Sequence, residues 1–212
     1  MAEVVIIDYG MGNLHSVYKS LVKVADKSSK IKISNSIEDI KNSSHIIFPG
    51  QGAASECMSS IKRHYDVVEL KHLISQKPFL GICMGLQVLM SNSDENNGVN
   101  CLDVFDGSVL SFKSKIGKSL KIPHMGWNKV QQKKTHPVWS GIPDHSFFYF
   151  VHSYFVKPAD INDSISTTEY GINFTSSIAR ENLVAVQFHP EKSSEPGLSL
   201  LKNFINWDGV LR

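Results

Sequence analysis

A cysteine flanked by two glycines is the residue of this sequence best suited to covalent chemistry. The segment Gly81-Ile82-Cys83-Met84-Gly85 lies between an apolar run and a helix-like run from Leu86 to Met90. Glycines on both sides allow the tight strand-to-helix turn that lifts a nucleophile clear of a sheet. The start of the following helix favours a thiolate and offers backbone N–H groups to an oxyanion. Cys83 is therefore a candidate nucleophile, although a small buried cysteine near a glycine-rich bend explains this segment alone equally well.

A histidine and a glutamate near the end of the chain could activate such a thiol. His189-Pro190-Glu191 follows the apolar run Val184 to Val186, and a thiol nucleophile needs a base that a third group orients. His189 and Glu191 are close enough in sequence to share a hydrogen bond that selects the imidazole tautomer. Taken alone, the segment is better explained by a surface turn with a solvated carboxylate.

A third strand-end turn is formed by Pro49-Gly50-Gln51-Gly52. Its glycines allow backbone amides to approach a substrate closely, so the loop is a candidate oxyanion donor, with a plain turn as the alternative. Ligands of open parallel sheets bind at the carboxyl ends of strands. We therefore expect this loop, Cys83 and His189 to meet at one edge of a sheet.

The elements that must position these residues alternate between strands and helices in the first half of the chain. Apolar runs predict buried strands, 3.6-residue periodicity predicts helices, and the βαβα order predicts a parallel sheet. Strands are expected at 4–7, 31–33, 45–48 and 79–82, and helices at 14–25, from 36, at 67–74 and from 86.

The second half contains short stretches that favour strands, followed by one amphipathic helix. These strands are expected to extend the sheet in antiparallel or mixed fashion. They lie at 104–112, 127–131, 147–151, 164–168, 172–180 and 184–188, and the helix lies at 196–207.

Length and composition limit the class of protein. The chain has 212 residues, 42% hydrophobic and 20% charged, which fits a single globular domain over residues 1–212. The net charge of +2 argues against a dedicated nucleic-acid binder. The start of the chain carries no signal or membrane segment, and three cysteines without a CxxC pair favour the reducing cytoplasm. Nine scattered histidines predict no metal site, and Gly10-Met11-Gly12 lacks the third glycine of a dinucleotide-binding loop, so no cofactor is expected.

The three strand-end segments PGQG, GICMGLQ and HPE resemble, in that order, those of the class I glutamine amidotransferase family. Their joint occurrence is far more specific than any one of them. Further matching segments begin at Asp8, Ile122, Tyr149 and Val186, so the resemblance covers nearly the whole chain. It implies an α/β fold with a doubly wound, largely parallel (mixed) sheet and helices on both faces.

The resemblance also implies hydrolysis of L-glutamine through a Cys-His-Glu triad. Cys83 would attack the side-chain amide, His189 would pass the proton to the departing ammonia, and Glu191 would orient His189. A glutamyl thioester would form, and water would release glutamate. The residues implied to bind the oxyanion or the substrate are Gly50, Gln51, Gly52, Met84, Gln87, His152, Ser153 and Tyr154.

The segments PHMGWN and FVHSY are most similar to those family members that pass ammonia to a separate (β/α)8-barrel synthase in histidine biosynthesis. Positions matching Asn13, Trp127 and Lys192 face that partner in those members. No second domain that could use ammonia is recognisable, so we expect the acceptor site on another chain of a heterodimer.

Three alternatives remain open at this point. The chain could serve a different synthase, such as one that amidates a nucleotide sugar, or it could be a γ-glutamyl hydrolase, which has no use for PHMGWN. A regulatory pseudoenzyme is the third, and the intact Cys83, His189 and Glu191 count against it. Two departures from the family pattern stand out: Gln51 replaces a small apolar residue, and Asp103 replaces a glycine where aspartate tolerates positive φ.

Overall fold

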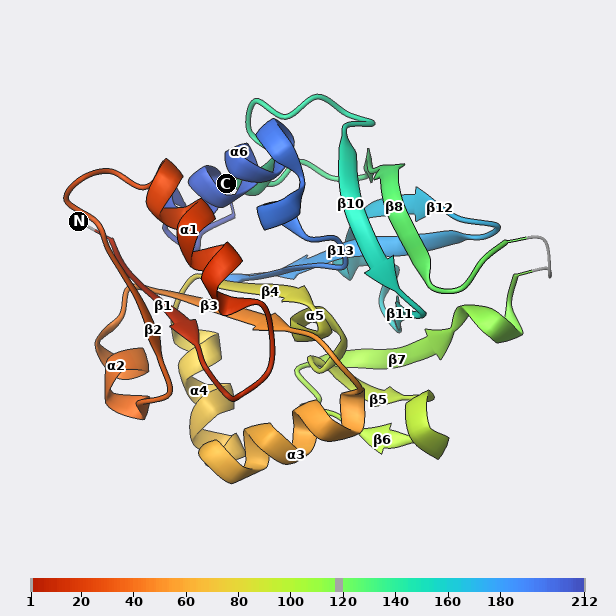
Figure 1. Ribbon diagram of the computed structural model, residues 1–212, viewed down its shortest axis with the longest axis horizontal. Helices are drawn as coiled ribbons and strands as arrows, with labels where there is room; N and C mark the ends of the chain where they lie inside the picture. The colour runs from red at the N-terminus through yellow and green to blue at the C-terminus, as the bar shows by residue number, and fades with distance from the viewer. Residues whose placement is uncertain (1, 117–119, 212) are drawn as a thin grey trace.

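Strands and helices alternate through the first half of the chain in the computed structural model (Figure 1). The structure describes residues 2–116 and 120–211; Met1, residues 117–119 and Arg212 of the expected single domain lie outside the described residues. The strands of this half are β1 (Glu3–Ile7), β2 (Lys30–Ser34), β3 (His45–Gly50) and β4 (Phe79–Cys83). The helices are α1 (Leu14–Val24), α2 (Ile37–Asn42), α3 (Ala54–His64), α4 (Val67–Gln76) and α5 (Met84–Gln87).

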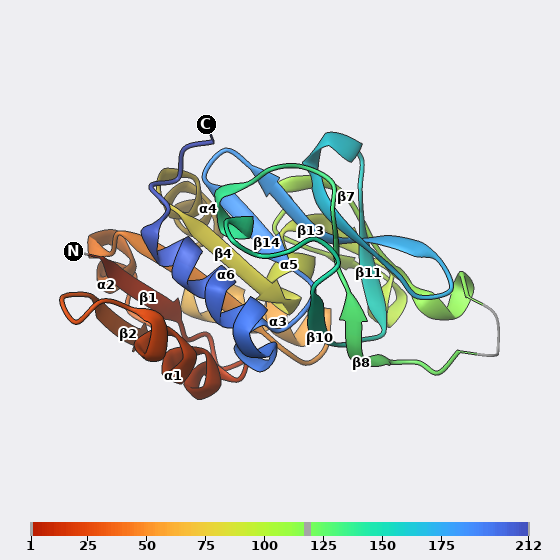
Figure 2. The same ribbon diagram turned by 90° about the horizontal axis from the view of Figure 1, so that it is seen from above.

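Strand β1 shows why these runs are continuously apolar. Successive side chains of a strand point to opposite faces, and both faces of this sheet are covered. Val4 and Ile6 join one core cluster, which includes residues of α1 and the C-terminal helix α6 (Ser194–Asn206). Val5 and Ile7 join a second cluster with residues of α2, α3 and α4. Figure 2 shows α1 and α6 lying over the parallel strands on the same side.

The second half consists mainly of strands joined by short 3-10 turns. The strands are β5 (Met90–Ser93), β6 (Val99–Asn100), β7 (Phe105–Ser111), β8 (His124–Lys129), β9 (Gln131–Gln132), β10 (Phe147–His152), β11 (Tyr154–Pro158), β12 (Ser164–Glu169), β13 (Asn173–Arg180) and β14 (Leu183–Val186). The 3-10 turns are η1 (Glu95–Asn97), η2 (Phe112–Ser114), η3 (Pro137–Trp139), η4 (Ile161–Asp163) and η5 (Pro190–Lys192).

Twelve strands of the described residues form one mixed sheet, with the path β2-β1-β3-β4-β14-β13-β11-β7-β5-β6; off this path, β12 pairs with β13, and β9 pairs with β12. Neighbours from β2 to β14 pair in parallel. Beyond β14 the pairs are antiparallel, except for the parallel pair of β5 and β7. A separate antiparallel pair of β8 and β10 packs beside this sheet. The predicted α/β fold with a mixed sheet and helices on both faces is confirmed.

The register of the parallel strands brings three carboxyl ends together. Gly50 at the end of β3 lies opposite Cys83 at the end of β4. On the other side of β4, Val186 at the end of β14 lies opposite Ile82. The segments that follow these strands therefore meet at one edge of the sheet, which is where parallel sheets bind ligands.

Several expected elements differ from the observed ones. No helix is expected at 54–64, yet α3 forms there, with Ala54, Cys57 and Ile61 buried on one face. The helix expected to continue from Leu86 to Met90 ends at Gln87, because Met90 pairs with Phe105 as the start of β5. None of the helices in the described ranges has the length and apolar character needed to cross a membrane.

Candidate active site

Cys83 lies on a strained turn between β4 and α5. Its φ of 56° and ψ of −105° place a residue with a side chain in a region that favours glycine. The neighbouring glycines are required by contact: a Cβ on Gly85 would lie 1.9 Å from the carbonyl oxygen of Phe48, and one on Gly81 would lie 2.7 Å from that of Gly85. The turn therefore requires glycine at positions 81 and 85, the two glycines that flank Cys83 in the sequence.

His189 follows β14 as the N-cap of the 3-10 turn η5, and Glu191 lies within that turn. Nδ1 of His189 lies 2.9 Å from Oε1 of Glu191. A carboxylate only accepts, so Nδ1 carries the proton and Nε2 is left for the thiol. The backbone of this turn is tied to β10, because His189 N donates to Tyr149 O at 2.9 Å and Tyr149 N donates to Ser193 Oγ at 2.9 Å. Ser193 Oγ in turn donates to His189 O at 2.6 Å.

The electrostatics of the pair favour a charged imidazole. Burial lowers the pKa of His189, but attraction to Cys83 and Glu191 outweighs it and raises the pKa to about 10. Both side chains of the turn are enclosed, with exposures of 9% for His189 and 1% for Glu191. A second polar group also reaches the sulfur: Gln187 Nε2 lies 3.8 Å from Cys83 Sγ. An imidazolium beside a thiolate is the state in which a cysteine attacks carbonyl carbon.

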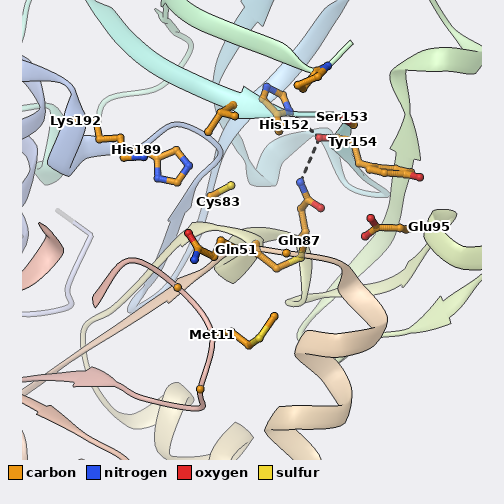
Figure 3. Close-up of a pocket in the computed structure, with 16 residues that line it drawn as sticks. Met11, Gln51, Cys83, Gln87, Glu95, His152, Ser153, Tyr154, His189 and Lys192 are labelled. Atoms are coloured by element: carbon orange, nitrogen blue, oxygen red, sulfur yellow. Dashed lines mark hydrogen bonds between the residues drawn. The ribbon is translucent and has the colours of Figure 1, made fainter. Parts of the chain in front are cut away.

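The pocket in front of these residues has a volume of about 710 Å³. Figure 3 shows Cys83, Gln87 and His189 pointing into it from three different elements. The pocket brings together most of the residues expected to bind substrate, and Lys192 lies at its wall. The residues named in the sequence analysis that line the pocket, whatever their expected role, are Gln51, Gly52, Cys83, Met84, Gln87, His152, Ser153, Tyr154, His189 and Lys192.

The loop after β3 presents its backbone to this pocket. Sγ of Cys57 on α3 lies 3.4 Å from the carbonyl oxygen of Gln51 and donates to it. In a trans peptide the N–H points opposite the carbonyl, so Gly52 N–H is directed away from α3. Gly50 does not line the pocket but packs beneath it, where a Cβ would lie 2.5 Å from the hydroxyl of Tyr9.

Two further expected residues stand apart from the pocket. Asn13 caps α1, accepting from Ser16 N at 3.4 Å. Trp127 is half exposed on β8, with its ring edge against Tyr149 at a centroid distance of 6.1 Å. His152 lines the pocket, but both of its ring nitrogens are bonded within the protein. The ring nitrogens of His152 are therefore not free to contact a ligand.

The structure adds residues that sequence reasoning missed. Gln187 bonds to both Cys83 and Gln87, and the signal for it was a glutamine interrupting the apolar run before His189. Glu95 lines the pocket from the 3-10 turn η1, and its Oε2 accepts from Ala54 N at 2.7 Å. Met11 approaches from the loop after β1. Across residues 2–116 and 120–211, no group of three His, Cys, Asp or Glu side chains could hold a metal ion.

Comparisons with known proteins identify the family of the chain. The model of the family "Glutamine amidotransferase class-I" matches residues 5–207. The chain belongs to the class I glutamine amidotransferase family, and it is an enzyme of that class. Imidazole glycerol phosphate synthase subunit HisH of Hydrogenovibrio crunogenus is 52% identical over 206 residues, which cover 97% of each chain. Its namesake from Nitrosococcus oceani is 46% identical and covers 99% of this chain and 100% of its own.

Solved structures of lower sequence identity share the fold of this amidotransferase. PurLQS from Thermotoga maritima superposes with a TM-score of 0.71 at 15% identity, covering 97% of this chain and 99% of its own. A glutamine amidotransferase from the same organism has a TM-score of 0.60 at 19% identity, covering 90% and 76%. The mixed sheet and its helices are therefore shared within the family at identities where little else of the sequence is retained.

Proposed function

We propose that this chain is the glutaminase subunit of an imidazole glycerol phosphate synthase, and that it hydrolyses L-glutamine to glutamate and ammonia. The observation that carries the proposal is the triad geometry. Nδ1 of His189 is bonded to Glu191 at 2.9 Å, and its charge is stabilised by Cys83 on the strained turn. The names of the similar proteins supply the pathway.

The reaction begins with the thiolate of Cys83 attacking the amide carbon of the substrate side chain. A C–S bond forms and the carbonyl oxygen becomes an oxyanion. His189 then gives its Nε2 proton to the amide nitrogen, the C–N bond breaks, and ammonia leaves a glutamyl thioester. Glu191 holds the imidazole throughout. Water attacks the thioester and returns a proton to Nε2, and cleavage of the C–S bond releases glutamate and restores the thiolate.

Oxyanion binding falls to backbone amides at the pocket wall. We assign it to the loop of Gly50, Gln51 and Gly52 and to Met84, which directly follows the nucleophile. The direction of the Gly52 N–H, opposite the carbonyl that Cys57 holds, supports this assignment. Gln87 and the backbone of the turn His152-Ser153-Tyr154 contact glutamine in this proposal.

Strand β8 and strand β10 provide the surface for the partner. Met125, Trp127 and Phe147 expose 62%, 50% and 49% of their surface, which is unusual for large apolar side chains on neighbouring strands. Nζ of Lys192 lies 5.8 Å from the ring centroid of Tyr149. We propose that this surface, with Asn13, binds a HisF-type (β/α)8 synthase subunit that consumes the ammonia in a heterodimer.

The setting of the enzyme is also part of the proposal. Cys57, Cys83 and Cys101 carry free thiols, which supports work in a reducing cytoplasm. We propose that residues 1–212 act as one glutaminase domain, because the nucleophile comes from the first half of the chain and its base from the second.

The experiment that tests the function is glutamate release from glutamine by the purified chain alone, with a HisF-type barrel, and with the barrel plus its nucleotide ligand. We expect little release alone and a large rise when both are added. No rise, with Cys83 still labelled by a glutamine-like electrophile, would assign the ammonia to a different synthase. Absence of labelling at Cys83 would refute the glutaminase activity itself.

A further inference from the structure

Two buried histidines form a hydrogen-bonded pair behind the pocket. His124 begins β8 and His152 ends β10, and the two are direct partners in the register of that strand pair. Nδ1 of His124 lies 2.9 Å from Nε2 of His152. The exposures are 3% and 5%, and His124 does not line the pocket.

The contacts of the pair allow one arrangement of protons. His152 Nδ1 lies 2.7 Å from the carbonyl oxygen of Tyr154, which only accepts, so Nδ1 carries the hydrogen. Nε2 of a neutral His152 is then an acceptor, and Nδ1 of His124 must donate to it. Burial lowers the pKa of His124 to about 4 and that of His152 to about 3, so both rings are neutral near pH 7.

The hydrogen bonds of His124 to Asn128, on the side away from the pocket, agree with this arrangement of protons. Nε2 of His124 is left as an acceptor and lies 3.2 Å from Nδ2 of Asn128. The amide of Asn128 is itself oriented, because Nδ2 donates to Glu169 O at 2.9 Å and Oδ1 accepts from Lys129 N at 2.8 Å. In each hydrogen bond from Asn128 to His124, to His152 and to the Tyr154 carbonyl, the donor is therefore the group farther from the pocket.

At the pocket end, this series of hydrogen bonds reaches Gln87 through the Tyr154 carbonyl. Gln87 Nε2 donates to the same Tyr154 carbonyl at 3.2 Å (Figure 3). It also donates to Gln187 Oε1 at 3.2 Å. Both N–H groups of the Gln87 amide are thus used within the protein. Its Oε1 is buried and has no partner among the described side chains and backbone, so it is an unused acceptor in a side chain that lines the pocket.

We propose that His124 is a positioning residue for substrate binding. By donating to Nε2 of His152 it fixes the His152 tautomer, which holds the Tyr154 carbonyl in place and presents Oε1 of Gln87 to an N–H group of glutamine. The proposal rests on the proposed function for the identity of the ligand. It gives PHMGWN, the segment expected to face the partner, a second role inside the protein.

The expected consequence is weaker binding without slower chemistry. An acceptor that bonds glutamine equally in the ground and transition states affects KM and leaves kcat almost unchanged. Loss of one such hydrogen bond corresponds to about a tenfold change in affinity. The nucleophile should keep its intrinsic reactivity, because His189 and Glu191 do not contact His124.

The test compares His124→Phe with His124→Asn. Phenylalanine keeps a flat ring for stacking on Phe150 and Tyr170, whose centroids lie 4.8 and 4.1 Å from that of His124, but it removes both nitrogens. The Asn side-chain amide retains an N–H at the position of Nδ1. The rate of Cys83 labelling is measured for each variant with a glutamine-like electrophile and with iodoacetamide, which needs no glutamine site.

We expect His124→Phe to slow labelling by the glutamine-like reagent about tenfold, to leave iodoacetamide unaffected, and to be largely rescued in His124→Asn. Equal slowing with both reagents and no rescue by Asn would mean that His124 only stabilises the fold. If His124→Phe is labelled by both reagents at the wild-type rate, His124 has no role in positioning the substrate contacts. If His124→Phe does not fold, ¹⁵N NMR of the wild-type chain decides: a His152 ring protonated on Nε2 overturns the proposal.

These outcomes are separable from failure of the proposed function. If wild-type Cys83 is not labelled by the glutamine-like reagent, the glutaminase assignment fails. If the wild type is labelled and the variants match it, only the role of His124 fails.

Discussion

The two halves of the pocket are held in place by different physical means. On the side of β3, β4 and β14, residues with apolar side chains cover both faces of the parallel strands, and the nucleophile turn is held by close backbone contact. On the side of β8, β10, β12 and β13, buried histidines, serines and threonines bond to one another; Ser166 Oγ lies 2.8 Å from Ser176 Oγ and 2.6 Å from Ser177 Oγ. Steric fit positions Cys83, and hydrogen bonds position the residues that we propose to contact the substrate.

Because of this difference, the two halves should respond differently to added side-chain volume and to pH. Close packing tolerates no added volume but is indifferent to pH, because it contains few titrating groups. A buried polar network tolerates isosteric change but weakens when a member gains or loses a proton. The following predictions test that contrast.

Removal of the nucleophile should have the largest effect. Cys83→Ala is expected to lower glutamine hydrolysis by at least about 10⁴-fold, because the thioester cannot form. Partner binding and synthesis from free ammonium should be retained, since the sulfur serves only the hydrolytic half-reaction. Glutamine-dependent product formation above trace level in this variant would contradict the assignment of Cys83.

Added volume on the packed side should cost the fold its stability. Gly85→Ala places a Cβ 1.9 Å from Phe48 O, and we expect a loss of about 3 kcal/mol in the free energy of unfolding. Gly141→Ala measures the cost of backbone conformation alone, because its φ is positive (70°) and no atom lies within 4 Å of the added Cβ, whereas Gly85 is not among the glycines with positive φ. A loss in urea unfolding for Gly85→Ala no larger than that for Gly141→Ala would show that the contact with Phe48 is relieved at little cost.

Loss of the orienting carboxylate should slow catalysis and shift its pH profile. In Glu191→Gln we expect kcat to fall about 100-fold. His189 has a raised pKa, so its proton is present at neutral pH and is lost as pH rises toward about 10. Because Glu191 contributes to that rise, the alkaline limb of the kcat profile should move to lower pH. An unchanged limb in the variant would mean that Cys83 alone sets the charge of His189.

Acid should destabilise the protein through its buried histidines, of which His124 and His152 lie on the polar side and His136 packs against Trp207. Burial lowers the pKa of His124 and His136 to about 4 and that of His152 to about 3, against about 6.5 in the unfolded chain. The unfolded state binds more protons below pH 6.5, so stability is present above that pH and is lost as pH falls toward 4. Each group contributes about 1.4 kcal/mol per pH unit within this window.

The measurement is urea unfolding between pH 7 and pH 4. His136→Asn should show a shallower decline than the wild type, since it removes one of the titrating groups. Identical slopes for the two chains would mean that His136 does not titrate on unfolding in this range.

Much of the packed side could be predicted from local sequence. β1, α1 and α4 follow from apolar periodicity, and Asp103 adopts the positive φ (54°) expected for an aspartate at a glycine position. The helix α3 was missed, although Ala54, Cys57, Met58 and Ile61 follow helical spacing, because small and polar residues dominate the segment. Met90 was placed in a helix because its pairing with Phe105 is a long-range choice that no local pattern encodes.

By itself, the sequence determined which residues can react and what the backbone must do at Cys83. Three features can be recognised without the tertiary structure. They are the glycine spacing around Cys83, the histidine followed by a glutamate, and the order of the three strand-end segments. Only the tertiary structure decided that Gln187 reaches the thiol, that Glu95 joins the pocket, and that the His152 ring faces His124 instead of the ligand. Hydrogen bonds between residues far apart in the chain depend on register and on the direction of each donor, and neither is fixed until the sheet has formed.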